Sequence, residues 1–242
     1  AGKGGEMAAL NLLTTRGLTR HFGALKAVDA IDFELRQGEV HALIGPNGAG
    51  KTTFVSLLCG RITPQSGSIT FDGHDITSLP AYSRVALGIA YTFQITSIYA
   101  NLSVFDNVAL AVQRKTRRDL TGDTMAALAR VGLHGRADQT AGTLAYGHQR
   151  LLEIAMGLAL DPKLLILDEP TQGLADAEIE AFNALIRAVT PQTTVLLIEH
   201  NMDVVMDLAD RITVLNAGET LALGPPADIR ANPAVQAAYL GG

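Results

Sequence analysis

The sequence predicts an α/β protein in which helices cover a parallel sheet, antiparallel strands lie on its N-terminal side, and a helical lobe is inserted into the chain. Two apolar segments, KLLILD at 163–168 and TTVLLIEH at 193–200, lack polar alternation and therefore indicate strands buried on both faces. Helical patterns follow both segments, as in a sheet whose parallel strands are joined by helices. The stretch from about 95 to 160 is helical in pattern, which predicts the lobe.

The elements are expected in a definite order along the chain. AVDAIDFEL, at 27–35, alternates with period two, as a strand with one solvated face does. Further strands are expected at 39–45, 66–73, 163–168, 193–200 and 211–219, and helices at 104–113, 123–132, 144–160, 177–189 and 201–210. We expect a single domain over 7–242, with its core formed by 7–94 and 161–242 and its lobe by about 95–160.

Composition limits the class of protein. The 242 residues are 48% hydrophobic and 18% charged, which suffices for a large buried core, and the net charge of −5 argues against nucleic acid as a partner. A single cysteine, Cys59, excludes an internal disulfide, and no apolar run approaches the roughly 18 residues that a membrane span needs. The glycine-rich start before Met7 has no secretory signal, so we expect a cytosolic protein whose residues 1–6 are a non-native leader.

A phosphate-binding motif lies between a strand and a helix. GPNGAGKT, at 45–52, matches G-x-x-x-x-G-K-[ST], with the apolar strand 40–44 before it and the helix 53–58 after it. Its glycines let the backbone curl so that several N–H groups face one point, where phosphate oxygens can bind. Lys51 is expected to reach the β- and γ-phosphates, and the Thr52 hydroxyl to bind Mg²⁺. The motif predicts a P-loop NTPase core whose nucleotide-binding residues are Gly45, Pro46, Asn47, Gly48, Ala49, Gly50, Lys51, Thr52 and Thr53.

Two carboxylates follow a buried strand. In LLILDEP, at 164–170, four apolar residues precede Asp168 and Glu169. Ligands of parallel sheets bind at the carboxyl ends of the strands, so both side chains are expected beside the phosphate loop. Asp168 is expected to hold Mg²⁺ through water, and Glu169 to polarise a water for attack on the γ-phosphate.

A helix without an N-terminal cap begins in LAYGHQRLLEIAMGLAL, at 144–160. No Ser, Thr, Asp or Asn stands where this helix should begin, so its first N–H groups lack a side-chain acceptor. Because a helix N-terminus attracts negative charge, we expect an anion beside Gly147. An apolar stripe is expected to bury the rest of the helix; it comprises Leu151, Leu152, Ile154, Ala155, Leu158 and Ala159.

Together the motifs resemble those of one family. The phosphate loop, LAYGHQ at 144–149, LLILDEP and then His200 after the next strand follow one another as in ATP-binding-cassette (ABC) ATPases. The resemblance covers the chain from about Leu12 to Leu240. It implies an ATPase that uses ATP and Mg²⁺ and powers transport from the cytoplasmic face of the membrane. It also implies, as partners, a second ATPase subunit (identical or paralogous), transmembrane permease subunits and, indirectly, a substrate-binding protein.

The resemblance implies roles for further residues. Phe22, in HFGALKAV, matches the aromatic residue that stacks on adenine. Gln94, in YTFQ, matches the glutamine that touches Mg²⁺ and the attacking water and signals to the membrane partner. His200 matches the histidine that contacts the γ-phosphate and helps to orient Glu169. The segment 95–108 and the lobe are expected to dock the permease. The signature loop, which meets the ATP bound by the second subunit, is expected at Leu144, Ala145, Tyr146, Gly147 and His148.

The sequence departs twice from the family's common pattern. The signature loop most often reads Leu-Ser-Gly-Gly-Gln, whereas Ala145, Tyr146 and His148 replace three of those five residues. The serine contact with the γ-phosphate is therefore missing, and we expect the loop to bind that phosphate through Gly147 and helix N–H groups. Ala175, in TQGLAD, stands where the family often has an aspartate, so a contact of that carboxylate across the dimer is not carried over.

Two segments indicate the subfamily. The signature running into QRLLEIA, and the ending at 224–242, resemble the ATPases of branched-chain amino acid importers. Importers of urea or short amides and a lipopolysaccharide exporter have similar ATPases, so these alternatives stay open. Further alternatives are a non-transport ABC ATPase acting on DNA or ribosomes and a small-molecule P-loop kinase. The first would carry a long coiled-coil insertion or tandem cassettes, and the second would lack LAYGHQ; neither description fits this acidic chain.

Overall fold

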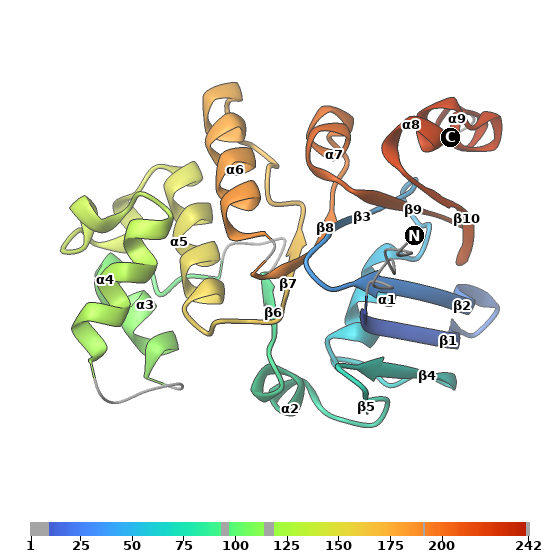
Figure 1. Cartoon of the computed structure of the whole chain (residues 1–242), viewed down its shortest axis with the longest axis horizontal. Helices are drawn as coiled ribbons and strands as arrows, with labels where there is room; N and C mark the ends of the chain where they lie inside the picture. Colours follow the sequence, from blue (N-terminus) through green and yellow to red (C-terminus); the bar gives the residue numbers. More distant parts are fainter. Residues whose placement is uncertain (1–9, 93–96, 114–118, 191, 241–242) are drawn as a thin grey trace, which may run out of the picture.

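A computed structural model describes residues 10–92, 97–113, 119–190 and 192–240 and arranges them as two β-sheets and a helical lobe (Figure 1). The lobe contains α3 (Val104–Val112), α4 (Leu120–Arg130) and α5 (Tyr146–Leu158), gathered on one side of the molecule. The α/β fold class predicted from the sequence is confirmed.

The larger sheet positions the ends of several parallel strands side by side. Its strand order in the described ranges is β10-β9-β3-β8-β7-β6, and all neighbours are parallel except β10 and β9. The strands are β3 (Val40–Ile44), β6 (Ile89–Thr92), β7 (Leu164–Asp168), β8 (Thr194–Ile198), β9 (Arg211–Asn216) and β10 (Glu219–Gly224). Every residue of β3, β7 and β8 is buried, as predicted for strands covered on both faces.

The smaller sheet is antiparallel and includes a long strand that the sequence did not predict. Its order is β2-β1-β4-β5, formed by β1 (Asn11–Phe22), β2 (Leu25–Arg36), β4 (Ser66–Phe71) and β5 (His74–Asp75). The pairing of β1 with β2 shifts register between Thr15 and Leu18, where Gly17 has a φ of 54°. This β-bulge interrupts the alternation of side chains, which explains why β1 shows no period-two pattern.

Capping residues decide where several helices begin. The remaining helices are α1 (Lys51–Leu58), α2 (Ala81–Ala86), α6 (Asp176–Val189), α7 (Met202–Leu208), α8 (Pro226–Ala231) and α9 (Pro233–Leu240). Helix α4 begins three residues before its predicted start because Asp119 accepts a hydrogen bond from Gly122 N at 2.9 Å.

Elements such as α2, α8, α9 and β6 were not predicted because they are too short to show a period. Across the described ranges, we find no helix long and apolar enough to cross a membrane.

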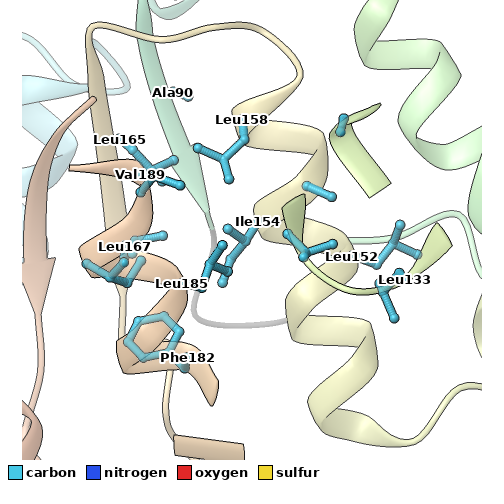
Figure 2. Close-up of a cluster of buried hydrophobic side chains, with 14 of the residues drawn as sticks. Ala90, Leu133, Leu152, Ile154, Leu158, Leu165, Leu167, Phe182, Leu185 and Val189 are labelled. Carbon is cyan, nitrogen blue, oxygen red and sulfur yellow. The ribbon is translucent and has the colours of Figure 1, made fainter. Parts of the chain in front are cut away.

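An apolar core joins the lobe to the larger sheet (Figure 2). Four members of the predicted stripe on α5 are fully buried, and the other two, Leu151 and Ala159, are partly buried against the same core. Figure 2 shows α5 and α6 running in the same direction, with Ile154 and Leu158 of α5 alongside Leu185 and Val189 of α6. The two helices therefore begin on the same side of the molecule.

Candidate active site

The phosphate loop joins the buried strand β3 to helix α1. Gly50 is the N-cap of α1, with a φ of 102° and no side-chain hydrogen bond, so the loop presents backbone N–H groups alone. Gly45 has a φ of 153°, and Cβ atoms at Gly45 and Gly50 would collide with the carbonyl oxygens of Leu215 and Ala27. Glycine is therefore required at both positions, for conformation and for space.

One turn anchors this loop to both sheets. Gly218 N, between β9 and β10, donates to the Ala49 carbonyl at 3.1 Å, and Asp29 N, in β2, donates to the Gly218 carbonyl at 2.8 Å. Phe22 ends β1, in the hairpin that β1 forms with β2, and is 46% exposed. The Arg20 guanidinium lies 5.0 Å from the centre of the Phe22 ring. The hairpin that carries the predicted adenine-stacking residue is thus tied to the phosphate loop.

Lys51 is held inside the loop by carbonyl groups. Its Nζ donates to the carbonyls of Gly45 at 2.6 Å and Pro46 at 3.1 Å, and the residue is buried. Burial lowers the pKa of Lys51, while the carboxylates of Glu169 and Asp168 act in the opposite direction. The ammonium is therefore within electrostatic reach of both carboxylates at the end of β7, those of Asp168 and Glu169.

Asp168 is buried at the end of β7 and receives a hydrogen bond from a tyrosine. Tyr91 Oη donates to Asp168 Oδ2 at 2.8 Å. Burial raises the pKa of Asp168, and the Tyr91 hydrogen bond and the Lys51 charge oppose this effect. Tyr91 was not among the predicted site residues. The signal that could have found it is the pairing of β6 with β7, which places Tyr91 beside Ile166, two residues before Asp168.

Glu169 faces His200 across the ends of two neighbouring strands. His200 Nε2 lies 3.0 Å from Glu169 Oε1, and Glu169 N donates to the Ile198 carbonyl at 2.8 Å. Glu169 has a φ of 47°, a left-handed conformation that costs on the order of 1 kcal/mol or more for a residue with a side chain. The chain thus maintains a strained backbone where a carboxylate meets a histidine, an arrangement typical of functional sites.

Glu199, a residue that the sequence did not single out, connects these two strand ends. It is 3% exposed, and its Oε1 accepts hydrogen bonds from Thr171 N at 3.0 Å and from the Thr171 hydroxyl. Its Oε2 accepts from His200 N at 2.7 Å and from Asn201 N at 3.0 Å. The turns after β7 and β8, at 169–172 and 199–201, line a cavity of about 260 Å³. An acidic residue directly after the apolar run 195–198 was the available signal.

Helix α5 begins without a side-chain cap, as predicted. Ala145 is its N-cap and makes no side-chain hydrogen bond, and Gly147 in the first turn is buried. The Glu178 carboxylate, from the first turn of α6, lies so close that a Cβ on Gly147 would overlap with it. The start of α5 therefore has a negative charge beside it within the same chain, which the sequence did not predict.

The predicted site is divided between two parts of the molecule. The loop at 45–50, Asp168, Glu169 and His200 meet at the carboxyl ends of β3, β7 and β8. The loop at 144–148 lies instead at the start of α5, and Figure 1 shows α5 and α1 on opposite sides of β7 and β8. Gln94 lies outside the described residues.

Comparison with known proteins identifies the family. The sequence pattern described as ABC transporter matches residues 28–172. The high-affinity branched-chain amino acid transport ATP-binding protein LivG of Salmonella typhimurium is 39% identical, over 95% of this chain and 98% of LivG. Its counterpart BraF of Pseudomonas aeruginosa is 38% identical, over 95% of this chain and 98% of BraF. The chain belongs to the ABC transporter ATPases.

Two further similarities refine this assignment. The pattern described as branched-chain amino acid ATP-binding cassette transporter matches residues 219–242 of the ABC ATPase. A crystallised ATP-binding cassette of an ABC transporter in its ADP conformation superposes with a TM-score of 0.89 and 25% identity, over 96% of this chain and 100% of that chain. As a member of the family, the chain binds nucleotide and is an ATPase.

The oxygen donors of the ABC ATPase fit a magnesium nucleotide. The exposed Thr52 offers a hydroxyl and Asp168 a carboxylate, the hard ligands that Mg²⁺ prefers. In the part of the chain that the structure describes, no group of three or more His, Cys, Asp or Glu side chains could hold a metal by itself.

Proposed function

We propose that this ABC ATPase is the ATP-hydrolysing subunit of an importer of branched-chain or related amino acids. The observation that carries this proposal is the Glu169–His200 pair beside the loop that contains Lys51. The similarity to LivG and BraF, and the match at 219–242, support the substrate class. ATPases of urea or amide importers, or of a lipopolysaccharide exporter, are the alternatives. Residues 7–242 act as one cassette in this proposal, with the lobe at about 95–160.

Nucleotide binding follows from the loop geometry. The backbone N–H groups of 45–53 bind the phosphates, and Phe22 stacks on adenine. Lys51 exchanges its carbonyl partners for β- and γ-phosphate oxygens, which compensates the burial of its charge. Thr52 and, through water, Asp168 would hold Mg²⁺, which when bound would neutralise part of the phosphate charge.

Hydrolysis is assigned to the two strand ends after β7 and β8. Glu169 accepts a proton from a water whose oxygen attacks the γ-phosphorus, while the bond from that phosphorus to the β–γ bridging oxygen breaks, giving ADP and phosphate. His200 holds the Glu169 carboxylate and contacts the γ-phosphate. In this proposal Gln94 contacts the same water and Mg²⁺ and signals to the membrane partner.

A second ATPase subunit, identical or paralogous, completes each site. Because α5 lies in the lobe, away from the chain's own phosphate loop, its uncapped start is placed to meet an ATP bound elsewhere, with the Glu178 carboxylate beside Gly147. We assign the loop at 144–148 to the γ-phosphate of the ATP held by the second subunit. Without a hydroxyl at Ala145, this contact relies on backbone N–H groups and the helix dipole.

A groove between core and lobe is the proposed docking site for a cytoplasmic helix of a permease. Its volume is about 450 Å³, and residues of α2, β6, α3 and α5 line it together with part of the segment 95–108. Tyr99 and Leu110, which are 57% and 42% exposed, offer apolar surface along it. An apolar groove of this kind suits one face of an amphipathic helix. The protein would then work on the cytoplasmic face of the membrane, with a substrate-binding protein acting only through the permease.

Two variants test binding and turnover separately. Lys51→Ala is expected to weaken binding of a fluorescent ATP analogue, whereas Lys163→Ala, which removes an exposed lysine paired with Asp72, should bind it normally. Glu169→Gln should bind the analogue but hydrolyse ATP about 10²- to 10⁴-fold more slowly, because it lacks the base. A Glu169→Gln protein that hydrolyses ATP at the wild-type rate would refute the assignment.

The substrate class needs a separate measurement. The ATPase would be co-purified with its permease subunits and its binding protein and reconstituted in vesicles. ATP-dependent uptake of leucine, isoleucine or valine is expected, and uptake of urea instead would select that alternative.

A further inference from the structure

The signature loop, 144–148, touches the loop that follows Glu169, here called the 170–175 loop. The edge of the Tyr146 ring lies against Gly173, where a built Cβ would stand 3.2 Å from Tyr146 Cε1. Gly173 has a φ of 78°, so both its conformation and the nearby ring favour glycine. A single aromatic side chain thus reaches from the start of α5 to the 170–175 loop.

A second contact joins the same two segments. Glu178 Oε2 accepts a hydrogen bond from Ala175 N at 2.9 Å, at the end of the 170–175 loop. The other oxygen of this carboxylate lies against Gly147, so closely that a Cβ there would displace the carboxylate. One carboxylate from α6 therefore contacts both the signature loop and the 170–175 loop, where the parallel helices α5 and α6 begin side by side.

A buried cation supports Tyr146 from its own helix. The Arg150 guanidinium lies 5.7 Å from the centre of the Tyr146 ring, within the range of a cation–π interaction. Arg150 is 3% exposed, and its Nη1 lies 3.0 Å from Glu153 Oε2. Because this ion pair is buried and packed, the ring is held in place while its outer part remains exposed to solvent.

We propose that Tyr146 and Glu178 are positioning residues that transmit docking of the signature loop to the chain's own Glu169. This inference rests on the proposed function, in which the signature loop contacts the ATP of the second subunit while Glu169 acts on the ATP of its own. Glu169 directly precedes the 170–175 loop, and Thr171 in that loop is hydrogen-bonded to Glu199. A displacement of Tyr146 would therefore move the segment that follows Glu169.

The contacts of Tyr146 and Glu178 involve both positions at which the sequence departs from the common family pattern. Tyr146 stands where the common signature has a glycine, and a glycine there could not reach Gly173. Ala175 lacks the carboxylate that the family often has, but its backbone N–H is bound by Glu178. Position 175 therefore offers no carboxylate to the second subunit, and its backbone is instead held by Glu178 of the same chain.

Steady-state ATP hydrolysis by the full chain tests the proposal. Tyr146→Ala and Glu178→Ala are each expected to lower kcat about 10- to 100-fold with little change in KM for ATP, because misplaced catalytic groups affect the chemical step. Tyr146→Phe keeps the ring edge and Glu178→Gln keeps an acceptor, so kcat should fall less in each of them than in the corresponding alanine variant. Tyr82→Ala and Glu180→Ala are matched controls, since Tyr82 is 71% exposed and Glu180 is an exposed residue two positions beyond Glu178.

Dimer formation separates a failure of this inference from a failure of the proposed function. With ATP, the Glu169→Gln protein should form a dimer in light scattering, alone or with a paralogous subunit, and adding Tyr146→Ala should leave that dimer intact. An unchanged kcat in Tyr146→Ala and Glu178→Ala, or a fall in kcat accompanied by loss of the dimer, would overturn the inference alone. If the Glu169→Gln protein forms no dimer with ATP, either alone or with a paralogous subunit, the result would count against the proposed function and, with it, the inference.

Discussion

Replacing Glu199 by glutamine tests whether its buried carboxylate joins the turn that contains Glu169 to the turn that contains His200. Its two oxygens accept four hydrogen bonds, two from Thr171 and one each from the backbone of His200 and Asn201. Glutamine has nearly the same shape but only one oxygen. If the amide NH₂ group faces the N–H groups of His200 and Asn201, both of those hydrogen bonds are lost. If it faces Thr171, the hydroxyl can turn and accept from it, so only the bond from Thr171 N is lost.

The expected loss of stability follows from those hydrogen bonds. Bonds to a charged group contribute about 1.5–3 kcal/mol each, so losing at least one of them lowers the free energy of unfolding by about 1.5 kcal/mol or more. With an m value of about 3 kcal/mol per molar urea, the midpoint of unfolding should fall by about 0.5 M or more. The kcat should also fall, because the Glu169 and His200 turns would no longer be joined.

Urea unfolding followed by circular dichroism measures the first effect, and ATP turnover at saturating substrate measures the second. Glu180→Gln, an exposed change on α6, is the matched control and should leave both values as in the wild type. A Glu199→Gln midpoint within about 0.2 M of the wild type would refute the reasoning, because it would mean that the bonds to the charged carboxylate contribute little.

Three further predictions concern single buried groups. Burial raises the pKa of Asp168, so the folded state disfavours its charge above its ordinary pKa of 3.8. Asp168→Asn should therefore unfold at a higher temperature than the wild type near neutral pH, lose this advantage as the pH falls through the raised pKa of the folded state towards 3.8, and have no ATPase activity; equal midpoints at neutral pH would contradict this. The guanidinium of the buried Arg84 donates to the carbonyls of Leu57 and Leu58 at the end of α1. Arg84→Ala should therefore lower the free energy of unfolding by about 3 kcal/mol in denaturant titrations, and a decrease of less than about 1 kcal/mol would contradict this role. Burial raises the pKa of the Cys59 thiol to about 12, so iodoacetamide should modify Cys59 only in urea, and mass spectrometry of the native protein would expose a wrong assignment as an alkylated peptide.

Local sequence patterns were sufficient for the fold class and for the residues nearest the phosphate. The glycines at 45 and 50, the strand before them and the helix after them are neighbours in the chain, so their conformation follows from a short segment. Asp168 and Glu169 could be placed at a strand end for the same reason. Strand β1 was missed because a bulge at Gly17 destroys its alternation, and the bounds of α4 were wrong because a cap, rather than the apolar period, decides where that helix begins.

By itself, the sequence determined which loop can bind phosphate, which carboxylates follow a buried strand, and that one helix begins without a cap. Only the tertiary structure decided which side chains support them. Tyr91 reaches Asp168 because β6 pairs with β7, and Glu199 joins two turns because β7 and β8 end side by side. The contacts of Tyr146 and Glu178 exist because α5 and α6 pack in the same direction. Strand order and helix direction arise from contacts between residues far apart in the chain, and no local pattern of residues carries that information.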